Sequence, residues 1–342
     1  MASKVVQEGT YGCVVKPPLP CVKTKAAKDN VGKIIRKKDT DIELSIATLV
    51  KAINGWENYY VLQDEDNCST QNFTKLRPMY ASQCRVYTES ENSELVQLLS
   101  PFSGNPVYGL NATKISSIDY IGSLKHLLTA VTKLNYQGIC HFDLHENNIL
   151  VDASGTMRII DFGSAFLGDA TTDSVVRRHV YDFSPKFPPQ PPELAVQNGI
   201  YSGMDIDTAL EQTVKQKRVY ILASKLLGVS VESSLRELRD FWSYNTTKYM
   251  SETLTTQCYT SSCSRKKKEI SWVPFFKTHW RSWDSWAIGV MFLNLLEKSF
   301  LNYNFINTVW KNNSSKIRTV LKGLLHSNPI KRLTAEEALD LL

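Results

Sequence analysis

The sequence lacks long apolar runs, a secretory leader and closely spaced cysteine pairs. Its longest apolar runs, 219–229 and 286–296, are too short and interrupted for a bilayer span, which needs about 20 residues. The opening residues, MASKVVQEG, contain no apolar stretch of the kind found in signal peptides. We therefore expect no membrane segment and no secretion.

The 7 cysteines are scattered, odd in number and free of any C-x-x-C pattern. This arrangement predicts reduced thiols in an intracellular compartment. The Asn-x-Ser/Thr triplets at Asn72, Asn111 and Asn245 are then chance matches rather than glycosylation sites.

Neither internal repeats nor low-complexity tracts are present. A hydrophobic content of 42% and a charged content of 22% over 342 residues predict a folded protein with one large or two moderate domains. The net charge of +6 suits phosphate-bearing ligands. The one compact basic run, 265–268, is too small to predict nucleic-acid binding, and we interpret it as a solvated loop in preference to a docking patch.

One stretch, 141–163, carries the strongest chemical signal. It is spelled HFDLHENNILVDASGTMRIIDFG, which predicts loop, strand, turn, strand and loop in that order. Asp143 and Asn148 lie on the loop before the first strand, and Asp161 follows the second strand. Asp143 can accept a proton from an attacking hydroxyl, while Asn148 and Asp161 offer the oxygen ligands that Mg²⁺ prefers.

This stretch resembles the catalytic loop and DFG segment of protein kinases, H-R-D-L-x-x-x-N followed by D-F-G. The resemblance implies that ATP and Mg²⁺ are the cofactors, that Asp143 is catalytic, and that Asn148 and Asp161 bind the metal. Phe142 stands where most protein kinases carry Arg. His145 replaces the usual Lys and resembles small-molecule kinases of the aminoglycoside-phosphotransferase type, so this stretch leaves the phosphoryl acceptor open.

Residues 5–15 predict a strand, a tight turn and a second strand, and they resemble the Gly-rich loop of kinases. Glycines there let the backbone approach the phosphates. The resemblance implies nucleotide contacts from Val6, Gly9, Gly12 and Val14. Gln7 replaces the first glycine of the pattern, which keeps a pseudokinase scaffold as an alternative. Cys13 lies in this loop and is predicted to react with thiol reagents, or else to pack into the sheet.

The run GTYGCVVKPPLPC resembles serine/threonine kinases of large cytoplasmic DNA viruses, including giant viruses. This resemblance implies a viral protein of the host cytoplasm, and also of the virion.

Lys33, in the strand 31–35, matches the phosphate-binding lysine of the kinase V-A-I-K pattern. Lys16 is the competitor, but it lies too close to Gly12 to be on a third strand. Apolar spacing predicts a helix over 39–52, and Glu43 near its start is expected to pair with Lys33, in preference to Asp41 on another face.

Further elements follow in the expected order. We predict strands over 58–63 and 95–100, a loop over 64–74 and a long helix over 118–137. Near 100–104 the resemblance implies a hinge between two lobes, whose backbone binds adenine. Pro101 has no N–H, so the donor comes from Phe102 or Ser103.

Residues 164–190 match an activation segment, and Glu193, Asp284 and Arg332 match positions that protein kinases use to stabilise the second lobe. The resemblance implies a buried Glu193–Arg332 ion pair and hydrogen bonds from the catalytic-loop backbone to Asp284. Small-molecule kinases generally lack this set, which favours a protein acceptor.

We therefore predict an α+β protein with the bilobal protein-kinase fold. Residues 1–103 form an antiparallel β lobe, and 104–342 form a mainly helical lobe with a long insert at 194–280. The insert is expected to contain helices over 207–227 and 231–244, followed by a Ser/Thr-rich stretch over 246–264. The predicted activity is ATP-dependent phosphorylation of Ser/Thr hydroxyls of proteins, with Asp143, Lys33 and Glu43 as catalytic residues and no nucleic-acid or membrane partner.

Overall fold

The computed structural model describes residues 3–9, 12–21, 29–63, 68, 83–90, 94–180, 183–250 and 271–342, without the side chains of 112 and 246–250. Most of the predicted loop 64–74, the Ser/Thr-rich stretch beyond residue 250 and the basic run 265–268 lie outside this part. The chain forms two compact units, one of Met1–Gly109 and Asn147–Ala165, the other of Leu110–Glu146 and Phe166–Leu342.

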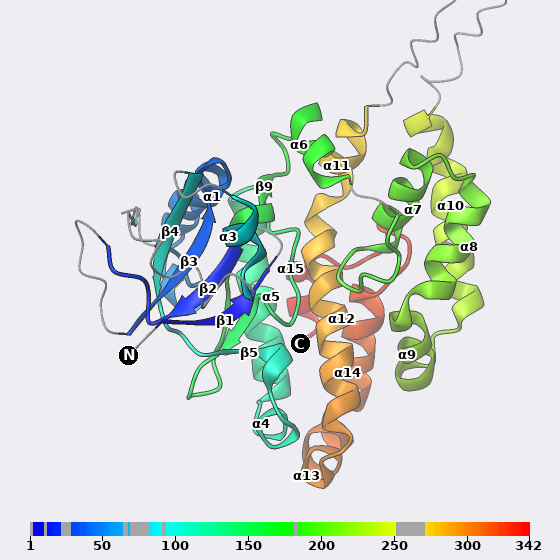
Figure 1. Cartoon of the computed structure of the whole chain (residues 1–342). Helices are drawn as coiled ribbons and strands as arrows, with labels where there is room; N and C mark the ends of the chain where they lie inside the picture. The colour runs from blue at the N-terminus through cyan, green and yellow to red at the C-terminus, as the bar shows by residue number, and fades with distance from the viewer. Residues whose placement is uncertain are drawn as a thin grey trace, which may run out of the picture. The chain divides into compact units, whose positions relative to one another are not determined.

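The first unit is built on an antiparallel four-stranded sheet, ordered β1-β2-β3-β4 (Figure 1). Its strands are β1 (Lys4–Glu8), β2 (Gly12–Lys16), β3 (Asn30–Arg36) and β4 (Leu95–Pro101). β2 contains Val14 and Val15, and β3 contains Val31, Ile34 and Ile35, β-branched residues that favour strands.

The two faces of this sheet are covered by different helices. Ile35 points toward α1 (Thr40–Lys51), where it packs with Leu44, Val96 and Leu98. Ile34 points to the opposite face and packs with residues near α3 (Arg85–Glu89). Since neighbouring strand residues alternate between faces, Lys33 lies on the α1 face together with Ile35.

A smaller sheet in the same unit is ordered β5-β7-β8. It consists of β5 (Asn105–Pro106), β7 (Ile149–Val151) and β8 (Met157–Ile159). Short 3-10 helices occupy Lys37–Asp39, Trp56–Asn58, Val107–Gly109 and Phe162–Ser164. Because β7 pairs with β5, Asn147–Ala165 and Asn105–Pro106 belong to the same unit.

The strand predicted over 58–63 is wrong. Trp56–Asn58 is a 3-10 helix, and Tyr60 makes only an isolated parallel bridge to Ile159. Tyr60, Val61 and Leu62 are consecutive buried residues. The segment is thus buried and pairs with β8 at a single residue, Ile159, so its apolar character reflects burial and not a full strand.

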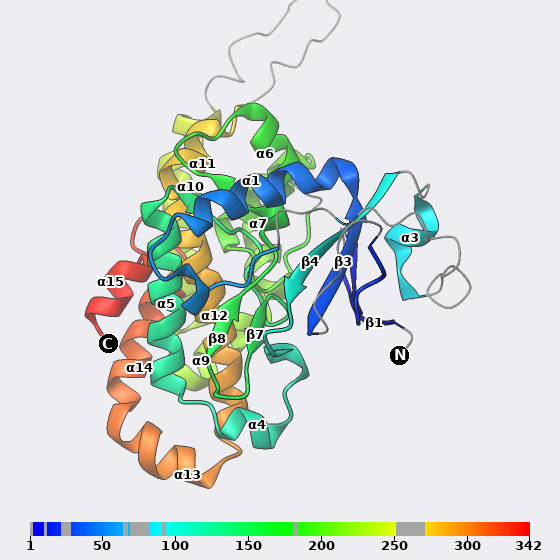
Figure 2. The same ribbon diagram turned by 90° about the vertical axis from the view of Figure 1, so that its left-hand side faces the viewer.

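The second unit is mainly helical (Figure 2). Its helices are α4 (Ala112–Ser116), α5 (Tyr120–Tyr136), α6 (Asp173–His179), α7 (Pro192–Tyr201), α8 (Ile206–Gln216), α9 (Arg218–Leu227), α10 (Val231–Met250), α11 (Val273–His279), α12 (Trp283–Ser299), α13 (Tyr303–Phe305), α14 (Lys311–Leu324) and α15 (Ala335–Asp340). A 3-10 turn covers Trp280–Ser282, and a π-helical turn covers Ile306–Trp310. Two short strands, β6 (Ile139–Cys140) and β9 (Phe166–Leu167), pair with each other.

Helix α12 is the core of this unit. Nearly every residue from Trp283 to Leu296 is buried, because α5, α9 and α14 pack around it. The predicted helix over 118–137 is confirmed as α5. It begins after the N-cap residue Asp119 and ends shortly before Gly138, whose backbone is in the left-handed conformation common after helices. No helix of the described residues is long and apolar enough to cross a membrane. The antiparallel sheet and the helical unit confirm the predicted fold class.

The helix predicted over 207–227 is two helices. Lys217 separates α8 from α9, with a backbone ψ of 111° that a helix cannot contain. Its side chain is fully buried, and Nζ donates hydrogen bonds to the carbonyls of Phe187 (2.9 Å) and Gln190 (2.7 Å). Burial lowers the pKa of this lysine to about 7, with Glu193 opposing the shift and Arg332 adding to it.

Four cysteines form disulfides, which corrects the prediction of reduced thiols. Cys13 is bonded to Cys84, and Cys21 to Cys68, whereas Cys140 is free and buried. Cys258 and Cys263 lie outside the described residues. Because Cys13 is bonded and 1% exposed, the predicted attack by thiol reagents is also wrong; the alternative, packing into the sheet, is what the structure has.

Reduction is expected to destabilise the first unit. The Cys13–Cys84 bond joins residues 71 positions apart, and closing a loop of this size stabilises a fold by about 2–5 kcal/mol. The melting temperature should therefore fall on treatment with a phosphine reductant. A variant with all four bonded cysteines changed to Ala is the control, since its melting temperature should not respond. Equal melting of the parent with and without reductant would contradict the bonding.

Candidate active site

Three charged side chains of the first unit form a compact network. Lys33 Nζ, on β3, lies 2.8 and 2.9 Å from the two carboxylate oxygens of Glu43, on α1. The same nitrogen lies 2.8 Å from Asp161 Oδ1. The predicted pairing of Lys33 with Glu43 is thus present, and Asp41 is exposed on another face of α1.

Burial makes this network strong. The side chains of Lys33 and Glu43 are 11% and 2% exposed. Burial alone would lower the pKa of Lys33, but the carboxylates of Asp161 and Glu43 outweigh it and raise that pKa. Lys33 therefore keeps its positive charge at any physiological pH.

Gln63 is a member of this network that sequence reasoning missed. Its side-chain amide donates a hydrogen bond to Glu43 Oε1, and it is 7% exposed. The donor helps to fix the Glu43 carboxylate, which has lost most of its water. The sequence does place this polar residue directly after the apolar run Tyr60–Leu62, which could have indicated a buried side chain with a polar partner.

Asp161 is held in an unusual backbone conformation. Its φ is 66°, in the left-handed region that Asp tolerates better than most residues. Its side chain accepts a hydrogen bond from the backbone N–H of Gly163 (3.3 Å). The next residue, Phe162, is fully buried and meets Tyr60 edge-on, with ring centroids 6.0 Å apart. These contacts fix the direction of the Asp161 carboxylate.

Asn148 supplies a second oxygen donor in the same unit. It precedes β7, is 4% exposed, and its carbonyl accepts a hydrogen bond from Ile160 N–H (3.0 Å). The described residues contain no group of three or more His, Cys, Asp or Glu that would hold a metal by itself. An amide and a carboxylate do fit Mg²⁺, which binds through one or two protein oxygens together with substrate phosphates.

The two strands predicted on either side of the Gly-rich turn are present as β1 and β2, and Thr10 and Tyr11 of the turn lie outside the described residues. Gly9 N–H donates to Gly12 O (2.8 Å). A Cβ on Gly12 would lie 2.3 Å from Ile34 O, so β3 itself requires glycine there. Val6 lies at a bulge in the β1–β2 ladder and is 57% exposed, while Val14 pairs with Lys33.

The predicted adenine donors require a correction. The N–H of Phe102 donates to the carbonyl of Asp29 (3.0 Å), because the β3–β4 ladder continues by one bond beyond Pro101. The backbone N–H of Phe102 is therefore already hydrogen-bonded within the protein. Of the two predicted donors to adenine, this leaves the backbone N–H of Ser103. Lys16, the competitor of Lys33, places its ammonium 3.0 Å from the centre of the Phe102 ring.

The catalytic-loop segment of the second unit is anchored by Asp284, at the start of α12. Its two oxygens accept hydrogen bonds from the backbone N–H groups of His141 (2.7 Å) and Phe142 (2.9 Å), as predicted. Burial raises the pKa of Asp284, while His141 and the two N–H donors oppose this shift. Asp143 follows this anchor, and its carboxylate lies 3.6 Å from His145 Nε2.

Phe142 occupies an aromatic cluster in the second unit. Its φ is 68°, and its ring contacts His179, Phe166 and Trp283 at centroid distances of 4.7, 5.6 and 5.7 Å. Aromatic contacts of this kind add to the energy of burial. His179 lies on α6, in the predicted activation segment, so this segment packs against the residue that replaces the usual arginine.

Two further ion pairs support the second unit. Glu193 and Arg332 form the predicted buried pair, with both N–O distances 2.7 Å and both side chains 0% exposed. Glu146 contacts Asn294 (3.3 Å) and Lys298 (3.4 Å) of α12, a connection that the sequence did not indicate.

The comparison with known proteins agrees with this geometry. The family model described as "Protein kinase domain" matches residues 2–207, more than half of the 342-residue chain. The chain therefore belongs to the protein kinase domain family. The match ends before Asp284 and Arg332, which the structure connects to the matched part.

Several named kinases are similar to the chain. It is 25% identical over 297 residues to a probable cyclin-dependent serine/threonine-protein kinase of Dictyostelium discoideum, which covers 85% of this chain and 39% of that protein. It is 32% identical over 80 residues to the probable serine/threonine-protein kinase glkA of the same organism (23% and 17% covered). It is 34% identical over 82 residues to the serine/threonine-protein kinase HAL5 of Saccharomyces cerevisiae (23% and 9% covered). The chain thus spans well under half the length of these relatives.

Proposed function

We propose that this chain is an ATP-dependent protein kinase that phosphorylates Ser and Thr hydroxyls. The observation that carries the proposal is the network of Lys33, Glu43 and Asp161, with Asn148 in the same unit. It combines a permanently charged lysine with two oxygen donors suited to Mg²⁺. The similarity to proteins named serine/threonine kinases supports the choice of acceptor.

Each residue then has a definite task. Bound Mg²⁺·ATP supplies the γ-phosphoryl group. Lys33, oriented by Glu43, holds the α- and β-phosphates, and Asn148 and Asp161 bind the metal. Asp143 orients the acceptor hydroxyl and takes its proton. The Gly-rich turn, with Val6, Gly9, Gly12 and Val14, covers the nucleotide, and Ser103 N–H is the proposed donor to adenine. Positioning and charge neutralisation supply most of the rate enhancement.

A small-molecule kinase is the competing function, because His145 lies beside Asp143. The buried Glu193–Arg332 pair and the anchoring of the loop by Asp284 favour a protein acceptor, since these features support the second lobe of protein kinases. The test is phosphoryl transfer from labelled ATP by the purified chain to Ser, Thr and Tyr versions of a peptide library and to amino sugars. Labelling confined to amino sugars or Tyr peptides would overturn the proposal, and no transfer to any acceptor would favour a pseudokinase.

The proposal extends to origin and location. The element GTYGCVVKPPLPC and the long insert resemble kinases of large DNA viruses, so we propose a virus-encoded enzyme of the host cytoplasm that also enters the virion. Virion surfaces permit disulfides, which agrees with the two bonds of the first unit. Mass spectrometry of purified virions with thiol alkylation tests this, and absence of the protein from virions, or fully reduced cysteines there, would contradict it.

Activity is expected to be independent of activation-segment phosphorylation. Phe142 cannot bind a phosphate, and its ring packs against His179 of α6 instead. Lys217 and Trp286 bind the carbonyls of Phe187, Gln190 and Pro188 and so hold the proline-rich end of the segment. Thr171 is 2% exposed and inaccessible to another kinase.

Phosphatase treatment, verified by mass spectrometry, should therefore leave turnover unchanged. Ser174→Ala, which removes an exposed hydroxyl, should behave like the parent. A large loss of turnover that rephosphorylation restores would show that the segment does depend on phosphate.

A further inference from the structure

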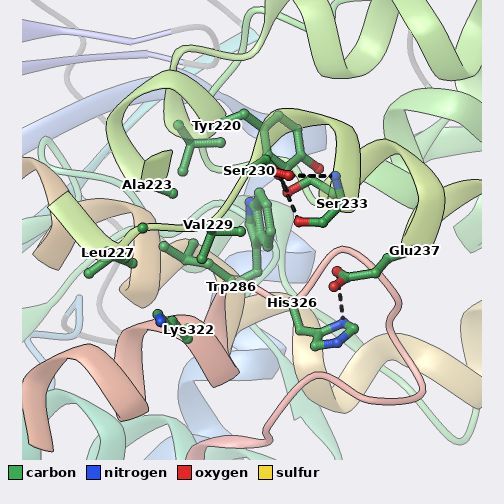
Figure 3. Close-up of a pocket in the computed structure, with 14 residues that line it drawn as sticks. Tyr220, Ala223, Leu227, Val229, Ser230, Ser233, Glu237, Trp286, Lys322 and His326 are labelled. Atoms are coloured by element: carbon green, nitrogen blue, oxygen red, sulfur yellow. Dashed lines mark hydrogen bonds and ion pairs between the residues drawn. The ribbon is translucent and has the colours of Figure 1, made fainter. Parts of the chain in front are cut away.

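The second unit contains a cavity of about 470 Å³ that none of the proposed active-site residues lines (Figure 3). It lies among α9, α10, α12 and α14. Its apolar walls come from buried side chains, chiefly Val219, Ala223, Leu227, Trp286 and Leu325. A volume of this size matches pockets for small organic ligands, which run from about 300 to 1,000 Å³.

One end of the cavity carries Glu237, from α10, and His326, from the loop after α14 (Figure 3). Glu237 Oε2 lies 3.5 Å from His326 Nδ1. That same nitrogen accepts a hydrogen bond from the backbone N–H of Asn328 (3.1 Å). A ring nitrogen that accepts a hydrogen bond presents its lone pair, so it cannot also donate a proton to Glu237.

The carboxylate of Glu237 is therefore short of a donor. Burial lowers the pKa of His326, and this effect exceeds the opposing charge of Glu237, so the ring is neutral near pH 7. Among the hydrogen bonds of the described residues, none donates to Glu237. Its side chain is only 32% exposed, which limits how much water can replace the missing donor.

The charges of Arg332 and Lys331 also act on His326 and help to keep its ring neutral. The Arg332 guanidinium lies 4.9 Å from the centre of the Trp286 ring and is paired with Glu193. Lys322, from α14, also lines the cavity, and Figure 3 draws no interaction between it and Glu237. Among the described residues that line the cavity, Glu237 is the acidic one.

We propose that this cavity binds a small organic cation, with its apolar or aromatic body against Trp286 and Leu227 and its ammonium or amidinium group donating to Glu237. An aromatic body gains contact area against the indole of Trp286. The cationic group supplies the donor and the charge that Glu237 lacks. This site is separate from the residues proposed to bind ATP, and it would exist whatever the phosphoryl acceptor is.

The probe for this site is tryptamine, and its anionic counterpart is indole-3-propionate, which has the same ring and a chain of similar length. Binding of each to the full chain is measured by NMR titration. Tryptamine is expected to bind the parent and Glu232→Gln, a change at an exposed position of the same helix, with equal affinity. Glu237→Gln should lower the affinity for tryptamine by about tenfold or more, because a charge-assisted hydrogen bond is lost.

Location is tested by Ala223→Trp, which fills the cavity and should abolish tryptamine binding in a variant with a parent-like circular dichroism spectrum. Equal affinity of tryptamine for the parent and Glu237→Gln overturns the proposal, as does retained binding in a folded Ala223→Trp variant. Should a variant not fold, the parent alone decides: indole-3-propionate binding as tightly as tryptamine, or no tryptamine binding, overturns the proposal.

Discussion

Asp143→Asn is expected to lower phosphoryl transfer by about 10²–10⁴-fold, the contribution of a positioned general base. The amide cannot accept the proton of the acceptor hydroxyl, although it keeps the shape of the carboxylate. ATP affinity should remain close to that of the parent, because Asp143 is proposed to face the acceptor and not the metal. The protein should stay folded, since the backbone anchor of this loop is Asp284 and not Asp143.

Asp161→Asn provides the contrast within the same experiment. It should also stop turnover, but through weaker Mg²⁺-dependent nucleotide binding, because Asp161 is a proposed metal ligand. It additionally removes a charge that lies 2.8 Å from Lys33. Calorimetric titration of Mg²⁺·ATP separates the two variants, and Asp240→Asn, at an exposed position of α10, is the matched control. If Asp143→Asn turns over at a rate close to that of the parent, Asp143 is not the residue that accepts the proton of the acceptor hydroxyl.

Arg332→Met is expected to destabilise the second unit by about 3–5 kcal/mol, because it leaves a buried carboxylate without its partner. Glu193 is 0% exposed and receives two 2.7 Å hydrogen bonds from Arg332. The arginine also donates to the carbonyl of His326 (2.9 Å), so the substitution leaves a second acceptor unpaired.

The pair Glu193→Leu with Arg332→Met serves as the control, since removal of both charges avoids the uncompensated carboxylate. It should recover a large part of the lost stability. Urea unfolding followed by tryptophan fluorescence measures the free energies, and the buried Trp280, Trp283 and Trp286 report on this unit. A loss below about 1 kcal/mol in the single variant would mean that the carboxylate finds another partner or takes up a proton.

Some contacts of the candidate site could be predicted from the sequence because each side of the contact occupies a short segment with fixed spacing. The pairing of Lys33 with Glu43 follows from one strand and the helix after it, and the anchoring of the His141 and Phe142 N–H groups by Asp284 follows from the motif at the start of α12. The helix containing Glu43 was equally predictable, because its apolar residues follow the helical period and its acidic residues favour the first turn.

Long-range pairings were harder to predict. Nothing in the spacing of Cys13 and Cys84 indicates a bond, because four or more cysteines allow several connectivities and the fold alone selects one. Similarly, the hydrogen bond from Phe102 to Asp29 depends on how far the β3–β4 ladder extends beyond Pro101. The last hydrogen bond between two paired strands depends on the path of both strands, so neither segment alone predicts it.

The break between α8 and α9 was missed for a related reason. Apolar residues recur at helical spacing on both sides of Lys217, and residues 207–227 contain no Pro or Gly that would predict a break. The break serves a contact with the carbonyls of Phe187 and Gln190, far from Lys217 in the sequence. Only the assembled unit shows why a lysine is buried there.

The buried lysine also changes how the segment between Glu193 and Asp284 should be treated in protein engineering. A segment that is long for this family invites removal to obtain a minimal catalytic protein. Here, however, truncation would delete Lys217 and leave the carbonyls of Phe187 and Gln190 without their donor, next to the Glu193–Arg332 pair. It would also expose the face of α12 that α9 covers. Shortened versions should therefore retain α8 and α9 and shorten the chain only beyond α10.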